Sequence, residues 1–355
     1  MKFTHETLPQ RVVFAAGESP AAIAAEVQAL GGSKVMLIAS DREKVLADPI
    51  AAQIPVVLRH EEVVMHVPVE VARRARAAAA HAGADILVSV GGGSTTGLAK
   101  AVAMTTGLPI VAVPTTYAGS EATNVWGLTE GATKTTGVDD KVLPASVVYD
   151  AGLLTTLPGE MTVASGLNAM AHCVDSMWGP RTDPIDRALA QEGIRGLASG
   201  LPTVAEDSTS VEGIEQTLYG AYLAAVAFAS AGSGMHHKIC HVLGGMFNLP
   251  HAQTHAVVLP YVLAFNAPHA PEAEARIAQA FGTVFRTEGA GAGLAALRQV
   301  LDAPRALREY GMPEDGIAKA LEPIMKAIPA GNPTPVTDEN LTALLKAAWA
   351  GDPID

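Results

Sequence analysis

The sequence contains little cysteine, few aromatic residues and little charge. Only Cys173 and Cys240 occur among 355 residues, and neither belongs to a CxxC pair, so we expect buried reduced thiols, not disulfides or a Cys/His metal site. Aromatic residues make up 5% of the chain and charged residues 17%, against 49% hydrophobic residues. This balance favours large buried cores and excludes extended disorder.

Positive charge is scarce as well. The chain has 24 lysines and arginines against 36 acidic residues, a net charge of −12, which argues against nucleic acid or an anionic membrane as a partner. No basic head followed by an apolar run marks a signal peptide at the N-terminus. The longest apolar stretch, Ala221 to Gly232, is too short to span a bilayer. We therefore expect a soluble, cytoplasmic protein.

Two domains are predicted from a change in the periodicity of hydrophobic residues along the chain. As far as Asp150, short apolar runs alternate with helical segments, which predicts a parallel sheet covered on both faces. The expected strands are residues 11–14, 34–40, 85–90, 109–113 and 145–150. Beyond that point helical periodicity dominates, with helices expected at 161–178, 183–199, 211–231 and 235–246. We place an α/β domain at 1–155 and an all-helical domain at 156–355, with the cleft between them as the expected ligand site.

A glycine turn in the first domain suits a phosphate group. The segment Gly91-Gly92-Gly93-Ser94 follows an apolar strand and opens a helix, where free N–H groups face an anion. A second loop, PTTYAGSE at 114–121, follows the next strand and lies at the same edge of the sheet. Asp41 ends another strand, where it can bind a ribose or cap a helix.

Histidines are concentrated in the second domain. Five of the chain's 11 histidines fall within residues 236–255, and His172 lies upstream, four residues after Asn168 and on the same helix face. Imidazole transfers protons and binds metals near neutral pH, so this array is the expected reaction site.

These segments resemble a known family. GGGSTTGLAKA, VPTTYAGSE, MTVASGLNAMAHCVD and GMHHKICHVLGGMFNLPHAQTHAVVLP occur in the order seen in the iron-containing alcohol dehydrogenase superfamily, specifically its maleylacetate reductase branch. The resemblance implies a Rossmann-like dinucleotide-binding domain followed by an all-helical domain, the fold shared with dehydroquinate synthase. It further implies NADH or NADPH in the cleft and a homodimer. The implied cofactor contacts are Asp41, Gly92, Gly93, Ser94, Thr115, Thr116 and Lys141, although Lys141 can equally be a solvated lysine.

The resemblance also predicts what happens at the metal position. Metal-dependent relatives place an Asp and three histidines around Fe²⁺ or Zn²⁺, and the matching positions here are Asn168, His172, His237 and His251. Asn is a neutral, poor ligand for a divalent cation, and its presence removes an anionic charge from the site. We therefore expect no metal, and reduction of a dicarboxylate enone, maleylacetate, by imidazoles and NAD(P)H.

The resemblance and the spacing assign roles within the array. The expected catalytic residues are His172, His237, His241 and His251, with His241 as proton relay. The expected substrate contacts are Asn168, Tyr117, His255 and Lys238, while Lys238 can also be solvated. His236, about 100° from His237 on a helix, is expected to form a wall of the pocket.

Three alternatives remain at this level. The first is a metal-dependent alcohol or polyol dehydrogenase, which Asn168 disfavours. A lyase resembling dehydroquinate synthase and a non-catalytic NAD-binding protein are the others. Asp41 favours NADH by repelling a 2′-phosphate, but Arg42 beside it can accept one.

Overall fold

The computed structural model describes residues 1–131 and 133–354 of the chain. Two compact units make up this chain: an N-terminal unit of Thr7–Leu157, and a helical unit in which Met1–Glu6 joins Pro158–Asp355. Each unit has its own hydrophobic core.

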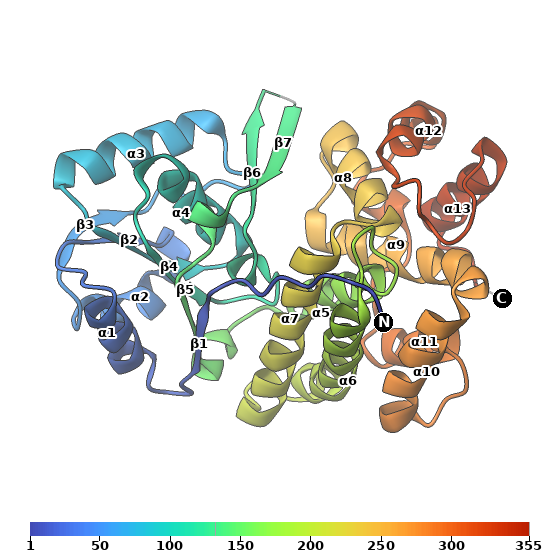
Figure 1. Ribbon diagram of the computed structural model, residues 1–355, viewed down its shortest axis with the longest axis horizontal. Coiled ribbons are helices and arrows are strands. Elements are labelled where there is room, and N and C mark those ends of the chain that lie inside the picture. The colour runs from blue at the N-terminus through green and yellow to red at the C-terminus, as the bar shows by residue number, and fades with distance from the viewer. Residues whose placement is uncertain (132, 355) are drawn as a thin grey trace. The chain divides into compact units, whose positions relative to one another are not determined.

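A six-stranded parallel sheet forms the centre of the N-terminal unit (Figure 1). Its strand order is β1-β8-β5-β4-β2-β3. The strands are β1 (Arg11–Phe14), β2 (Val35–Ile38), β3 (Val56–His60), β4 (Ile86–Gly91), β5 (Ile110–Pro114) and β8 (Ser146–Tyr149). All residues of β2, β4, β5 and β8 are buried, as expected for strands covered on both faces.

Four helices cover this sheet. They are α1 (Ser19–Ala29), α2 (Lys44–Ala51), α3 (Val69–Ala82) and α4 (Gly93–Thr106). Ile23 and Val27 of α1 and Ile50 of α2 pack into one core with alternate strand residues such as Val35 and Leu37. Figure 1 shows α3 and α4 on the other side of the sheet. The predicted combination of an α/β sheet domain and an all-helical domain is confirmed.

The sequence prediction missed β3 and a separate antiparallel hairpin of β6 (Val125–Glu130) and β7 (Thr133–Val138). β3 lies at the edge of the sheet, where none of its residues is fully buried, and Arg59 and His60 end its apolar run. The hairpin is a two-stranded ribbon rich in threonine and glycine, which gives no hydrophobic period.

The helical unit carries the remaining long helices. They are α5 (Gly159–Ser176), α6 (Pro184–Glu206), α7 (Val211–Ala231), α8 (Met235–Phe247), α9 (His251–Asn266), α10 (Pro271–Phe285), α11 (Ala290–Val300), α12 (Gly316–Ala327) and α13 (Asp338–Ala350). The predicted end of α6 at Ser199 is too early, because the helix continues through Gly200 and Pro202. A Cβ on Gly200 would lie 2.4 Å from the Thr217 hydroxyl oxygen, so the glycine there allows close packing on α7 and does not end the helix.

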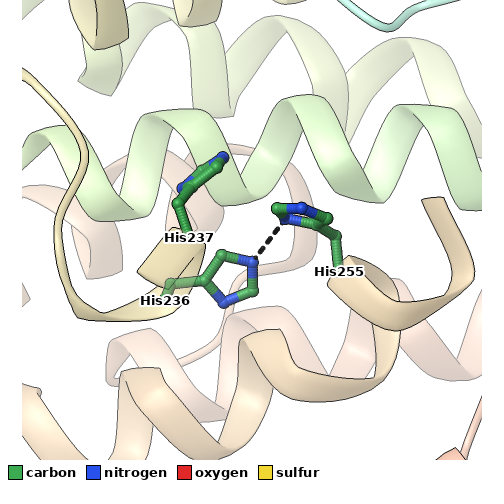
Figure 2. A group of neighbouring side chains, drawn as sticks. All are labelled: His236, His237 and His255. Carbon is green, nitrogen blue, oxygen red and sulfur yellow. Dashed lines mark hydrogen bonds between the residues drawn. The ribbon is translucent and has the colours of Figure 1, made fainter. Parts of the chain in front are cut away.

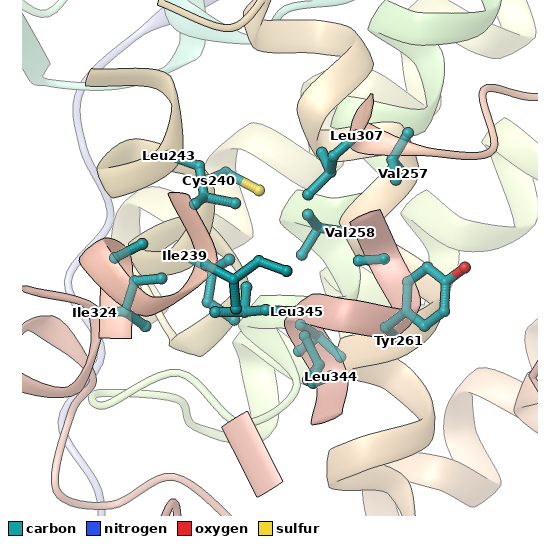
Figure 3. Packing of buried hydrophobic residues seen from close by; sticks show 14 of the residues in the cluster. Ile239, Cys240, Leu243, Val257, Val258, Tyr261, Leu307, Ile324, Leu344 and Leu345 are labelled. Carbon is teal, nitrogen blue, oxygen red and sulfur yellow. The ribbon is translucent and has the colours of Figure 1, made fainter. Parts of the chain in front are cut away.

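The helices that carry the histidines are fixed by a hydrophobic cluster (Figure 3). Ile239 and Leu243 of α8 pack with Val257 and Val258 of α9 and with Leu345 of α13. Cys240 belongs to the same cluster, and burial raises the pKa of its thiol. Both cysteines are free and buried, which confirms the prediction.

Among the described helices, none is long and apolar enough by itself to cross a membrane. Only α7 and α8 taken together pass a test of length and composition, and they are bent against each other by 96°.

Candidate active site

The glycine turn and the threonine loop meet at the carboxyl ends of the neighbouring strands β4 and β5. β4 pairs with β5 so that Gly91 lies opposite Pro114, and the amide of Thr115 donates to the Gly91 carbonyl at 3.2 Å. Gly92 is the N-cap of α4, and its carbonyl accepts the amides of Thr95 and Thr96 at 3.0 and 3.1 Å. The first N–H groups of α4, those of Gly93 and Ser94, have no acceptor within the helix and are suited to an anion.

Close packing explains why glycine is needed in this turn. A Cβ on Gly92 would lie 3.0 Å from Cγ2 of Thr116, so a larger residue would push the threonine loop away. The structure therefore brings together the predicted phosphate turn and the predicted Thr115 and Thr116 contacts. Tyr117, the predicted substrate contact of this unit, follows them and is 1% exposed.

The two other predicted cofactor residues are exposed. Asp41 begins a short 3₁₀ helix three residues after the end of β2. The N-cap of that helix is Ser40, not Asp41, so the capping role considered for Asp41 does not occur. Lys141 lies in a short 3₁₀ turn that packs against α4, and its backbone amide donates to Asp139 at 2.9 Å.

A buried lysine ties the threonine loop to α4, and the sequence analysis overlooked it. The Lys100 ammonium is fully buried and donates to the Thr123 carbonyl and the Val125 carbonyl, both at 2.8 Å. Burial lowers the pKa of Lys100 to about 7, against the opposing charge of Glu121. The signal for this residue was available, because Lys100 is the one charged residue in the otherwise apolar helix segment GLAKAVAM.

In the helical unit, three helices bring the predicted histidines together. α5 carries Asn168 and His172, the first two turns of α8 carry His236, His237 and His241, and α9 begins at His251 and carries His255 one turn later. The rings of His172 and His237 stack with centroids 4.9 Å apart, and Phe228 packs against both. His255 lies 4.7 Å from His237 and 4.4 Å from His251 between ring centroids.

Asp175 is the site residue that the sequence analysis missed. Its carboxylate is fully buried and accepts the His237 Nδ1–H at 2.8 Å and the Gly234 amide at 2.8 Å. The His236 amide donates to it at 3.3 Å, so Asp175 on α5 caps the N-terminus of α8, whose own N-cap residue is a glycine. Asp175 lies seven residues after Asn168, and the i, i+4, i+7 spacing of Asn168, His172 and Asp175 was the signal that could have found it.

His236 and His255 form a hydrogen-bonded pair (Figure 2). The Nε2 atom of His236 and the Nδ1 atom of His255 lie 2.9 Å apart, and neither side chain is exposed. His236 is therefore more than the pocket wall that its helical position predicted, because it fixes the orientation of His255. The ligand atoms of His236, His237 and His255 all lie within 4.8 Å of one another.

Burial keeps these imidazoles neutral. Loss of hydration lowers the pKa of His172 to about 4 and that of His236 to about 3. The pKa values of His237 and His255 are also well below the usual range, first through burial and then through the neighbouring histidines. Each buried ring therefore offers one N–H donor and one lone pair.

Several polar atoms of the cluster are left without a hydrogen-bond partner among the described residues. They are Asn168 Oδ1, His172 Nδ1, His236 Nδ1, His237 Nε2 and His255 Nε2. For His237 the tautomer follows from its partner: Nδ1 donates to Asp175, so Nε2 carries the lone pair. A carboxylate that orients a histidine in this way is the common outer-shell arrangement of metal-bound histidine. The donor set fits a divalent metal ion.

The other predicted residues lie around this cluster. The His241 ring is 6.0 Å from that of His237 and half-buried. His251 is exposed, with its ring 6.2 Å from that of His241. Lys238 is half-buried. Its role as a carboxylate partner stays a prediction.

The chain belongs to the iron-containing alcohol dehydrogenase family. The family model "Iron-containing alcohol dehydrogenase" matches residues 9–151, and "Fe-containing alcohol dehydrogenase family, C-terminal" matches residues 162–349.

Similar proteins include several maleylacetate reductases of this family. The chain is 44% identical over 355 residues to a maleylacetate reductase of Sphingobium indicum, covering 99% of each chain. A solved structure of an iron-containing alcohol dehydrogenase from Corynebacterium glutamicum is 61% identical with a TM-score of 0.97, covering 99% of this chain and 98% of that one. The solved maleylacetate reductase of Agrobacterium tumefaciens is 38% identical with a TM-score of 0.91 and 99% coverage of both chains.

The prediction that no metal is used is wrong. Family models for iron-containing enzymes match nearly the whole chain, and the solved relative at 61% identity is named for its iron. The reasoning from Asn168 overlooked Asp175, whose buried carboxylate supplies negative charge behind His237. Asn168 removes an anionic ligand, but it leaves three or more imidazole nitrogens, which suffice to hold a divalent cation.

Proposed function

We infer that this protein is a maleylacetate reductase, an oxidoreductase that reduces the carbon–carbon double bond of maleylacetate to give 3-oxoadipate. The observation that carries this inference is a cluster of six histidines, with Asn168 one turn before His172 on α5, in a chain that matches maleylacetate reductases along its full length. Such a cluster suits a substrate with two carboxylates, because imidazole N–H groups donate to carboxylate oxygens and take up charge when needed.

The reaction needs a hydride, a place for negative charge and a proton. NAD(P)H supplies the hydride, which adds to the alkene carbon β to the ketone. The electron pair of the double bond then moves to the ketone oxygen as an enolate, and the adjacent carbon takes a proton. We propose that the phosphate turn at Gly92, Gly93 and Ser94 and the loop at Thr115 and Thr116 hold the dinucleotide.

The imidazoles stabilise the enolate and move the proton. The His255 ring is fixed by His236, and the His237 ring is fixed by Asp175, so both are oriented before substrate arrives. An N–H donor aimed at the enolate oxygen lowers the barrier without further reorganisation. We propose His241, half-buried one turn after His237, as the group that exchanges the proton with water.

Iron fits the same cluster. His237 would hold it through Nε2, with His172 and His251 at the positions implied by the family, or with His236 and His255, whose ligand atoms lie nearest. A ferrous ion bound there would act as a Lewis acid toward the ketone oxygen. His237 is common to both ligand sets and is therefore the residue on which metal affinity should depend most.

Three further proposals concern the cofactor, the oligomeric state and the location of the protein. NADH is the expected cofactor because Asp41, three residues after the end of β2, repels a 2′-phosphate, while Arg42 leaves NADPH usable. Assembly as a homodimer and location in the cytoplasm stay predictions. Light scattering of the purified chain tests the first.

The test is NAD(P)H oxidation with maleylacetate, followed by absorbance, on iron-loaded protein and on protein stripped by a chelator. The proposal expects turnover, 3-oxoadipate as product, and loss of turnover in His237→Ala. A protein that oxidises simple alcohols with NAD⁺ but leaves maleylacetate untouched would instead be an alcohol dehydrogenase.

A further inference from the structure

A second cluster of metal-ligand side chains lies in the helical unit, outside the histidine site. His5, Asp183 and Asp186 each offer one ligand atom, and these atoms lie within 4.8 Å of one another. His5 belongs to the segment Met1–Glu6, which is part of the helical unit although the chain next enters the N-terminal unit. Two segments 178 residues apart therefore meet at this point.

The local structure directs one oxygen of each carboxylate toward His5. Asp183 is the N-cap of α6, and its Oδ1 atom accepts the amides of Ile185 and Asp186 at 2.7 and 3.0 Å. Asp186 completes the capping box, because its Oδ2 atom accepts the Asp183 amide at 3.2 Å. The remaining oxygens, Asp183 Oδ2 and Asp186 Oδ1, lie 2.8 and 3.7 Å from His5 Nδ1.

One of these oxygens is buried without a hydrogen bond. The Asp186 side chain is fully buried, and its Oδ1 atom has no hydrogen-bond partner among the described residues. The carboxylate of Asp183 is only 3% exposed, so two acidic groups share a space that little water reaches. Burial raises the pKa of Asp186 and the charge of Asp183 adds to the rise, while the Ser230 hydroxyl and His5 act to lower it. A buried oxygen atom of this kind calls for a positive partner.

We propose that His5, Asp183 and Asp186 form a structural binding site for a divalent cation, which fastens the N-terminal segment to the start of α6. One imidazole nitrogen and two carboxylate oxygens are ligands that zinc accepts, with water completing a tetrahedron. Zinc bonds of about 2.0–2.2 Å place neighbouring ligand atoms roughly 3 to 4 Å apart, close to the spacing found here. A divalent cation also neutralises both carboxylates, which a single protonated histidine cannot do.

Zinc binding to the chelator-stripped full chain tests this site. The number of zinc ions bound at buffered free Zn²⁺ is measured for wild type, His5→Ala, Asp186→Asn and the control His81→Ala, which removes an exposed histidine of α3. We expect His5→Ala and Asp186→Asn each to bind one zinc fewer per chain than wild type and His81→Ala. His5 is in the short N-terminal segment, so its replacement should leave the fold intact.

Hydrogen exchange supplies a second readout that is independent of the iron site. Zinc should slow amide exchange at residues 2–8 in wild type and in His81→Ala, and leave it unchanged in His5→Ala. Equal zinc numbers in all four proteins, or exchange at residues 2–8 that zinc does not alter in wild type, would overturn the proposal. Either result would mean that His5 and the two carboxylates form only an ion pair.

Discussion

Replacing Asp175 by Asn should weaken both α8 and the metal site behind it. The carboxylate of Asp175 accepts two hydrogen bonds of 2.8 Å, from His237 Nδ1 and from the Gly234 amide. An amide oxygen in the same place keeps both bonds but loses the charge, which costs about 1 kcal/mol for each. The NH₂ group of the asparagine then faces the His236 amide, so two donors meet where Oδ1 of Asp175 accepted a hydrogen bond.

The expected loss of folding free energy is about 2–3 kcal/mol, since relief of a buried charge offsets part of the cost. Affinity for Fe²⁺ or Zn²⁺ should fall by about 10- to 100-fold, the usual effect of losing a carboxylate behind a metal-bound histidine. Urea unfolding measures the first quantity and metal titration of stripped protein the second.

A matched control is Asp302→Asn. Asp302 pairs with Arg305 at 2.9 Å, but the two side chains are 89% and 74% exposed. The free energy of unfolding should therefore change by no more than about 0.5 kcal/mol, and metal affinity should be unaltered. The reasoning fails if Asp175→Asn binds the metal as tightly as wild type, because His237 would then need no carboxylate to fix its tautomer.

Three further changes test other parts of the structure. In the wild-type protein the pKa of Lys100 is lowered to about 7, so above that pH the unfolded chain binds more protons than the folded chain. The free energy of unfolding should therefore rise from about pH 7 toward pH 10, by at most about 1.4 kcal/mol per pH unit. Lys100→Met should abolish this rise. Parallel unfolding curves for the two proteins over this range would contradict this. Asn168→Asp should tighten Fe²⁺ binding by about tenfold, or 1.4 kcal/mol, by adding an anion one turn before His172 on α5, and metal titration checks it. Gly92→Ala should raise the KM for NADH more than it lowers kcat, because the added Cβ would lie 3.0 Å from Thr116, and an unchanged KM would exclude the turn as the phosphate site.

The sequence predicted the fold class from the change in hydrophobic period. Strands such as Ile86–Gly91 are continuous apolar runs because they are covered on both faces, and this made them easy to recognise. The edge strand Val56–His60 and the hairpin have no such continuous buried run and were missed, although the other edge strand, Arg11–Phe14, was predicted. Every strand that is buried along its whole length was predicted.

The histidine positions could be predicted, but their partners could not. The motifs located His172, His237 and His251, while the bond between His236 and His255 depends on how α8 meets α9. The helical spacing places Asp175 on the same face as Asn168 and His172, but its contact with the start of a helix 60 residues later in the chain is visible only in the folded structure. The incorrect expectation of a metal-free site was drawn from Asn168 and from the resemblance, and it did not take Asp175 into account.

The most direct test of the central claim is NADH consumption by iron-loaded protein with maleylacetate as substrate, compared with NAD⁺ reduction in the presence of simple alcohols. The account predicts stoichiometric conversion of maleylacetate to 3-oxoadipate, with turnover that depends on His237 and little activity on the alcohols. Efficient alcohol oxidation with no maleylacetate turnover would contradict it and identify the histidine cluster as the site of another reaction in this family.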